Sequence, residues 1–278
     1  MPTGRYLAGR VTVSAMLLHF LQKRRPNTLD LEKIQAVLFD LDGTLIDVDM
    51  QRFVPGYLRR LTENMGAQVN PQRATRALHQ AVAAMFANTD SKVTLEDILL
   101  EELQSQLNLS PANYAASLDR FCRHGLELLR PMVSGHPLSP QLIEASLARG
   151  WQAVLATNPI FPRAVIDARL AWGGLDSEAF DHITAYETAH FCKPNPTFFE
   201  EILERLQLPA EACLMVGNDT EHDLAAGQVG MQTCLLTPWS IRRFGASFKA
   251  DWQGTHRELL TLIEPSGFVR RQSTLCPD

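Results

Sequence analysis

The chain has 278 residues, of which 45% are hydrophobic and 21% are charged, and its formal net charge is −5. This composition describes a globular protein with enough apolar residues for one large domain or two modest ones. The chain lacks the strong positive charge of a nucleic-acid-binding protein, and no apolar run is long enough to cross a bilayer. We therefore expect neither a nucleic-acid partner nor a membrane span.

Five cysteines are scattered along the sequence, and no two of them form a Cys-x-x-Cys pair. Their odd number and their spacing argue against a disulfide framework and against a zinc site made of thiolates. Such cysteines are typical of a reducing compartment, so the sequence predicts a cytoplasmic protein.

The two ends of the chain differ from the rest in composition. Residues 1–30 are basic, and the stretch 11–21 is mostly apolar, which is a pattern of targeting peptides and membrane-surface helices. However, the basic cluster follows the apolar stretch, and no small-residue cleavage site stands out. We predict that residues 1–30 form a non-secretory extension of unknown role. The polar residues 265–278 predict a flexible tail.

The first predicted strand, Ala36–Phe39, ends in the carboxylates Asp40 and Asp42, which are followed by Gly43. Because burying a charge beside an apolar strand is costly, a strand that ends in this way usually opens onto a site. An extended backbone points residues two apart to the same side. Asp40 and Asp42 could bind a divalent cation, or one could attack a substrate while the other handles protons. The alternative interpretation is an ordinary strand-to-turn junction.

Residues 47–134 predict a helical insertion with no convincing strand. Most of its helices begin at a proline or a capping residue. The predicted helices are Arg52–Met65, Pro71–Ala87, Leu95–Leu107 and Pro111–Leu129. An insertion placed directly after the acidic loop is well placed to cover it, so we interpret residues 47–134 as a helical cap.

From residue 135 onward, short apolar runs alternate with helical patterns. This alternation is typical of a parallel sheet with right-handed crossovers. The predicted strands are Ala153–Ala156, Ile183–Ala185, Cys213–Val216 and Thr233–Leu236, and the predicted helices are Pro162–Trp172, Pro196–Leu206 and Leu224–Val229. The predicted fold class is α/β, with a Rossmann-like parallel sheet core formed by residues 31–46 and 135–264 and an inserted all-helical cap.

Three polar segments follow the later strands. Thr157 and Asn158 offer a hydroxyl and an amide that could bind phosphate at a helix start, although such a pair is more often an N-cap. Lys193 precedes a proline, and a lone lysine there is usually a solvated loop residue. Asp219 and Asp223 are four residues apart and would share one face of a helix.

In their order along the chain, these segments and the string Phe-Asp-Leu-Asp-Gly-Thr-Leu at residues 39–45 resemble the motifs of the haloacid dehalogenase (HAD) superfamily of hydrolases. The resemblance covers residues 34–262, and the cap is matched only by its location and helical character. There is one departure: many members carry Asp where this chain has Asn218. The resemblance leaves open whether Asn218 or Asp219 occupies the metal-ligand position.

The resemblance implies a Mg²⁺-dependent phosphatase that hydrolyses a small phosphorylated metabolite through an aspartyl-phosphate. Asp40 would be the nucleophile and Asp42 the general acid and base, while Thr157 and Lys193 would bind the phosphate oxygens. The other residues to which the resemblance gives a role are Gly43, Thr44, Asn158 and Arg52 for substrate binding, and Asp40, Asp42, Asp219 and Asp223 for the metal.

Three other functions stay open at this point. A phosphomutase would need a cap that retains the product, and a metal-free dehalogenase of the same superfamily would not need the acid at Asp42. A non-catalytic HAD-like binding protein would be expected to have lost at least one of the catalytic residue types, all of which this chain has. The sequence gives no prediction of the oligomeric state.

Overall fold

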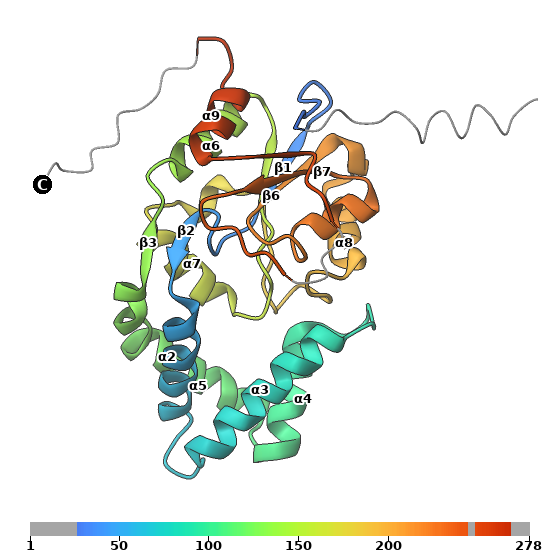
Figure 1. The fold of residues 1–278 in the computed structure, drawn as a ribbon. Helices are drawn as coiled ribbons and strands as arrows, with labels where there is room; N and C mark the ends of the chain where they lie inside the picture. Colours follow the sequence, from blue (N-terminus) through green and yellow to red (C-terminus); the bar gives the residue numbers. More distant parts are fainter. Residues whose placement is uncertain (1–26, 244–247, 268–278) are drawn as a thin grey trace, which may run out of the picture.

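A parallel sheet of six strands forms the centre of the computed structural model, which describes residues 27–243 and 248–267 (Figure 1). The strand order is β5-β4-β1-β6-β7-β8, and every neighbouring pair is parallel. The strands are β1 Ala36–Phe39, β4 Gln152–Leu155, β5 His182–Ile183, β6 Cys213–Gly217, β7 Gln232–Leu236 and β8 Trp252–Gly254. The predicted extension and tail lie largely outside the described residues.

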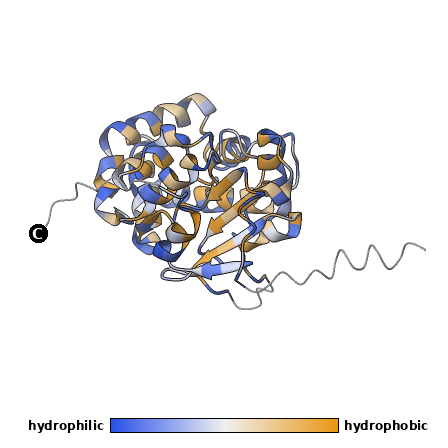
Figure 2. Cartoon of the chain, turned by 90° about the horizontal axis from the view of Figure 1, so that it is seen from above, coloured by the Kyte–Doolittle hydropathy of each residue, from blue (hydrophilic) through white to orange (hydrophobic). Residues whose placement is uncertain are grey.

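Helices cover both faces of the sheet. The first face packs against α6 (Ser139–Ala148), α7 (Arg163–Trp172) and α9 (His256–Ile263), and the second packs against α8 (Pro196–Leu206) and the 3-10 helix η4 (Leu224–Val229). Apolar strands therefore run through the middle of the molecule between the helices (Figure 2).

The central strand β1 shows why its sequence is a continuous apolar run. Ala36 and Leu38 belong to the hydrophobic cluster around α8, while Val37 and Phe39 belong to the cluster on the opposite face. Because successive side chains of a strand point to opposite faces, a strand covered on both sides must be apolar at every position. The polar Asp40 that follows is therefore at the boundary of the core.

The helical insertion lies on one side of the sheet and is joined to it by a pair of short antiparallel strands, β2 (Ile46–Val48) and β3 (Val133–Gly135) (Figure 1). Its helices are α2 Met50–Glu63, α3 Pro71–Ala87, α4 Leu95–Leu107, α5 Pro111–His124 and the 3-10 helix η1 Leu126–Met132. The predicted fold class is confirmed. The domain limits at residues 47 and 134 stay a prediction.

The helix ends of the insertion follow local capping chemistry. Asn70, Thr94 and Ser110 each accept a hydrogen bond from the backbone of the first turn of α3, α4 and α5, respectively. At α4, Asp97 also accepts from the backbone of Thr94, which completes a capping box. No helix among residues 27–243 and 248–267 is long and apolar enough to span a membrane.

Two predicted helices differ from the structure. The helix predicted over 111–129 ends at His124, because Gly125 interrupts it, and the chain continues as the 3-10 helix η1. The segment Leu224–Val229 is a 3-10 helix rather than an α-helix, and it ends at Gly230, whose φ of 97° lies in the left-handed region. The strands β2, β3 and β8 were not predicted. Each has only three residues, which is too few for a periodic pattern in the sequence.

Candidate active site

The register of the sheet brings the predicted motif residues to one edge. Phe39 at the end of β1 is paired with Leu155 of β4 on one side and with Val216 of β6 on the other. Because the strands are parallel, the residues that follow them leave the sheet at the same edge. Asp40, Thr157 and the loop 217–223 therefore converge, although they are far apart in the sequence.

Lys193 lies at the centre of this edge, between two carboxylates. Its Nζ is 2.7 Å from Oδ1 of Asp40 and 2.6 Å from Oδ1 of Asp223. Lys193 is only 1% exposed, and Asp40 and Asp223 are also buried. A lysine this deeply buried is stable as an ammonium only with such partners, so the interpretation of Lys193 as a solvated loop residue is wrong.

The ion pairs set the protonation of this cluster. Burial alone would lower the pKa of Lys193, but the charges of Asp223 and Asp40 outweigh it and raise that pKa above its usual value. Burial raises the pKa of Asp223, and the neighbouring ammonium of Lys193 opposes this rise. The arrangement is a positive charge placed beside the carboxylate of Asp40.

Asp223 also shapes the loop that precedes it. Its Oδ2 accepts hydrogen bonds from the backbone N–H groups of Asn218 and Asp219, both at 2.9 Å. Gly217 is required here, because a Cβ at this position would overlap the carboxylate of Asp223. Both oxygens of Asp223 are therefore engaged, one by Lys193 and the other by the backbone.

The turn after Asp40 is equally tight. Gly43 has a φ of 78°, which favours glycine, and the side-chain amide of Asn218 fills the space where a Cβ would lie. The hydroxyl of Thr44 donates to Oδ2 of Asp40 at 3.2 Å. The side chain of Asn218 thus packs against the turn that follows Asp40 (the Asp40 loop), and Thr44 of that loop contacts the Asp40 carboxylate.

Asn158 connects the segment after β4 to the segment that contains Lys193. Its Oδ1 accepts from the backbone N–H of Lys193 at 2.9 Å, and its Nδ2 lies 3.3 Å from Nδ1 of His222. The preceding residue, Thr157, is buried at the end of β4, where its carbonyl accepts from the hydroxyl of Thr184 at 2.7 Å. The structure therefore brings Thr157 and Asn158 to the same edge as Lys193.

Asp219 is paired with a residue that the sequence analysis missed. Arg243 donates to Oδ2 of Asp219 from Nη2 at 2.7 Å and from Nε at 2.9 Å. Oδ1 accepts from the backbone of Glu221 and His222. Although burial would raise the pKa of Asp219, these hydrogen bonds outweigh it and lower that pKa.

The oxygen donors at this edge suit a small, hard cation. Mg²⁺ prefers oxygen ligands and usually retains several waters, so it needs few groups from the protein. The carboxylate of Asp40, the main-chain carbonyl of Asp42 and one side chain of the loop 217–223 would suffice. That side chain is Asp219, whose oxygens Arg243 engages, or Asn218, whose Nδ2 donates to the carbonyl of Trp239 at 2.9 Å. Within the described part of the chain, no three Asp, Glu, His or Cys side chains form a metal cluster.

Arg52 lies apart from this group of residues. It is in the first turn of α2, its side chain is 71% exposed, and its only ion pair within the described residues is with Asp49, at 4.0 Å. A cap residue beside the loop 217–223 is Phe86, at the end of α3, whose ring centroid is 6.3 Å from that of His222. Phe86 is 43% exposed.

A cavity of about 450 Å³ lies within the insertion, between α2 and α3. Its lining residues are Pro55, Leu58, Arg59, Thr62, Pro71, Gln72, Thr75 and His79. None of these is a motif residue, so this cavity is separate from the edge that carries Asp40.

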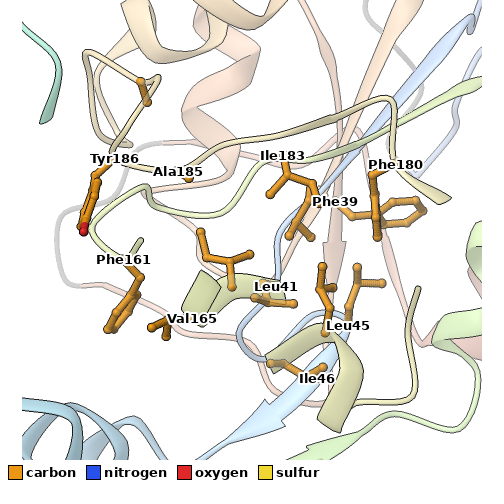
Figure 3. Packing of buried hydrophobic residues seen from close by; sticks show 14 of the residues in the cluster. Phe39, Leu41, Leu45, Ile46, Phe161, Val165, Phe180, Ile183, Ala185 and Tyr186 are labelled. Carbon is orange, nitrogen blue, oxygen red and sulfur yellow. The ribbon is translucent and has the colours of Figure 1, made fainter. Parts of the chain in front are cut away.

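A second missed residue, Arg169 of α7, forms an ion pair with Asp42. Val165 and Phe161, in and just before α7, pack toward Leu41 and Leu45 of the Asp40 loop (Figure 3). Arg169 shares the buried face of α7 with Val165. A charged residue at a core-facing position of the predicted helix was the available sequence signal.

A family model for haloacid dehalogenase-like hydrolases matches residues 34–230, which is more than half of the chain. The chain belongs to the haloacid dehalogenase-like hydrolases. The matched segment of this HAD-like hydrolase includes Asp40, Lys193 and Asp223, whose geometry is described above.

Among known proteins, the chain is similar to a phosphoglycolate phosphatase from Aquifex aeolicus (strain VF5), with 26% identity over 240 residues, 85% of this chain and 96% of the relative. It is also similar to the pyrophosphatase PpaX of Bacillus mycoides (strain KBAB4), with 23% identity over 79% of this chain and 92% of the relative. A HAD phosphatase structure from Thermococcus onnurineus aligns with a TM-score of 0.51 and 19% identity over 83% of this chain and 98% of the other. The structural match supports the shared fold.

Proposed function

We propose that this HAD-like hydrolase is a Mg²⁺-dependent phosphatase acting on a small phosphorylated metabolite through an aspartyl-phosphate at Asp40. The observation that carries the proposal is the position of Lys193, 2.7 Å from Asp40 and within the same buried cluster. A carboxylate attacks a phosphate dianion only when the negative charges of both are offset. The ammonium group of Lys193 supplies one positive charge that offsets them.

In the first step, an Asp40 oxygen attacks phosphorus and the bond from phosphorus to the ester oxygen breaks. The ester oxygen keeps the electron pair and takes a proton from the carboxyl group of Asp42, so that the alcohol leaves. Thr157, Asn158 and backbone N–H groups of residues 41–44 bind the other phosphate oxygens, for which the N–H groups of Gly43 and Thr44 must leave the carbonyls of Ile46 and Leu41 that they contact here. Arg52 would reach the substrate from the exposed start of α2.

In the second step, the Asp42 carboxylate takes a proton from water while the water oxygen attacks phosphorus. The bond between phosphorus and Asp40 breaks, the electron pair returns to the Asp40 carboxylate, and inorganic phosphate is released. General acid and base catalysis of this kind contributes about 10²- to 10⁴-fold.

Mg²⁺ would be held by the Asp40 carboxylate, the Asp42 carbonyl and Asp219, with Asp223 behind them, orienting Lys193 and the loop backbone. When bound, the cation would supply positive charge to the phosphate oxygens. The four free cysteines of the described chain, Cys122, Cys192, Cys213 and Cys234, support a cytoplasmic location.

The names of the two relatives, a phosphoglycolate phosphatase and a pyrophosphatase, support phosphate transfer over dehalogenation. Asp42 supports the same choice, because leaving-group protonation needs an acid at this place. The insertion over the site favours a small substrate, because a cover excludes folded macromolecules.

The test is phosphate release from a panel of sugar phosphates, nucleotides and aryl phosphates, with and without Mg²⁺. Asp40→Asn removes the nucleophile, and we expect it to lower turnover by about 1,000-fold or more. Asp47→Asn is a matched control, since Asp47 is an exposed carboxylate of β2. Equal phosphate release by the wild type and Asp40→Asn would contradict the proposal.

A further inference from the structure

Arg169 is the largest of the side chains that are completely buried in the described structure. Its guanidinium carbon lies 4.9 Å from the ring centroid of Phe53 and 5.1 Å from that of Phe161. Phe53 belongs to α2 of the insertion, while Phe161 belongs to the core. The guanidinium group therefore lies at the contact between cap and core.

Only one of the nitrogens of this group has a hydrogen-bond acceptor. Nη2 bonds to Oδ1 of Asp42, whereas the buried Nε and Nη1 have no hydrogen-bond partner among residues 27–243 and 248–267. Burial lowers the pKa of Arg169 to about 10, a shift that the charge of Asp40 opposes. A buried cation with unpaired donors does not stabilise the fold, so stability alone does not explain why an arginine stands here.

Arg169 contacts only one of the two carboxylate oxygens of Asp42. Asp42 is partly exposed, with a side-chain exposure of 21%, and follows Asp40 in the loop that leads to Gly43. Arg169 holds Oδ1, while no described residue bonds to Oδ2. The contact with Arg169 thus fixes the orientation of the carboxyl group and leaves Oδ2 for a proton.

Resting on the proposed phosphatase function, we propose that Arg169 is a positioning residue that orients Asp42 for protonation of the leaving group. Phe53 and Phe161 hold the plane of the guanidinium group, so the orientation of Asp42 depends on the cap being in contact with the core. In the step concerned, the proton moves from Oδ2 of Asp42 to the ester oxygen as the bond from that oxygen to phosphorus breaks.

The test compares two esters that need this proton to different degrees. An alkyl phosphate releases a basic alkoxide and depends on the acid, while 4-nitrophenyl phosphate releases a stable phenolate and does not. We expect Arg169→Met to lower kcat for the alkyl ester by roughly 10- to 100-fold and for the aryl ester by less than about 3-fold, with KM unchanged for both. Arg169→Lys keeps the charge without the planar fork and should give an intermediate loss.

Arg163→Met is the matched control on the same helix, because the Arg163 side chain is 45% exposed and, in the described part of the chain, forms its ion pair with Asp167 in α7. It should change neither ester. In the Asp42→Asn background, Arg169→Met should cause no further loss on the alkyl ester, since both residues act through one carboxyl group.

Equal losses on both esters, a loss confined to KM, or multiplying losses in the double variant would each overturn the role of Arg169. If Arg169→Met does not fold, the same comparison is made with Arg169→Lys, where equal losses again overturn it. A wild-type chain that releases no phosphate from any member of the phosphate panel would instead overturn the phosphatase proposal, which is a distinguishable result.

Discussion

At the scale of single residues, two cations form ion pairs with the carboxylates around Asp40. Lys193 lies between Asp40 and Asp223, while Arg243 covers Asp219 on the other side of the loop 217–223. Asp223 and Asp219 therefore each pair with a cation of their own. A magnesium ion that uses Asp219 must compete with Arg243, whose side chain is 40% exposed and can move into solvent.

We predict that Asp219→Asn weakens Mg²⁺ binding by at least about tenfold, because a carboxylate is replaced by a neutral amide. Arg243→Ala should strengthen binding a few-fold, because it removes the competing cation. Asn218→Ala should have little effect. Isothermal titration calorimetry without substrate measures these affinities. A large loss in Asn218→Ala with no change in Asp219→Asn would assign the position to Asn218 instead.

At the scale of elements, the Asp40 loop is supported from the C-terminal part of the sheet. His256, the first residue of α9, donates from Nε2 to the carbonyl of Thr44 at 2.7 Å. Its ring stacks on His136, with centroids 3.6 Å apart, and the edge of Trp239 packs against both. The carbonyl of Trp239 also accepts from Asn218, so this cluster contacts both loops of the site.

The two histidines make stability depend on pH. Burial and the neighbouring His256 lower the pKa of His136 to about 4, and burial lowers the pKa of His256. A histidine whose pKa is lower in the folded state contributes stability above its unfolded pKa of about 6.5, and this contribution is lost as the pH falls toward the folded value.

We expect the free energy of unfolding to fall between about pH 7.5 and about pH 5.5, and His136→Gln to reduce that fall by about 1 kcal/mol. Urea denaturation at the two pH values measures the difference. His79→Gln serves as a control, because His79 lies in α3 and outside the His136–His256 cluster. An identical pH dependence in His136→Gln and the wild type would contradict the account.

The elements that the sequence predicted best are those with a local signal at their ends. The bounds of α3, α4 and α8 agree with the prediction, because Asn70, Thr94 and Asn195 cap them. The motif residues beside Asp40 were found through their resemblance, in order along the chain, to the motifs of the haloacid dehalogenase superfamily. Arg243 was missed, since a lone arginine carries no sign of a partner that lies far away in the sequence. Arg169 was missed although it stands at a core-facing position of its predicted helix, and that position does not name Asp42 as its partner.

At the scale of the whole molecule, the insertion contacts the core both near its connecting strands and at its far end. Near the connecting strands, Phe53 packs edge-to-face against Phe161. At the far end, backbone N–H groups of Leu95 and Glu96 donate to the carbonyls of Ala189 and Tyr186, both at 2.9 Å. The sequence predicted the location and helical character of the insertion but not these contacts, which depend on how the helices pack in three dimensions.

The contacts at the far end lie in the segment that leads from β5 to Lys193. Asn88 donates from Nδ2 to the carbonyl of His190 at 2.8 Å, close in sequence to Lys193. The cap and the segment that precedes Lys193 are thus joined by hydrogen bonds. Asp40, Lys193 and Asp223 are buried at this edge of the sheet, which suits the phosphoryl transfer proposed above.

The covalent step at Asp40 is tested most directly by rapid quenching of the enzyme with its best substrate from the phosphate panel, followed by mass spectrometry of the peptides. The account predicts a phosphoryl group on the peptide that contains Asp40, formed before phosphate release and absent in Asp40→Asn. Turnover with the phosphoryl group on another residue, or with Asp40→Asn as active as the wild type, would contradict it.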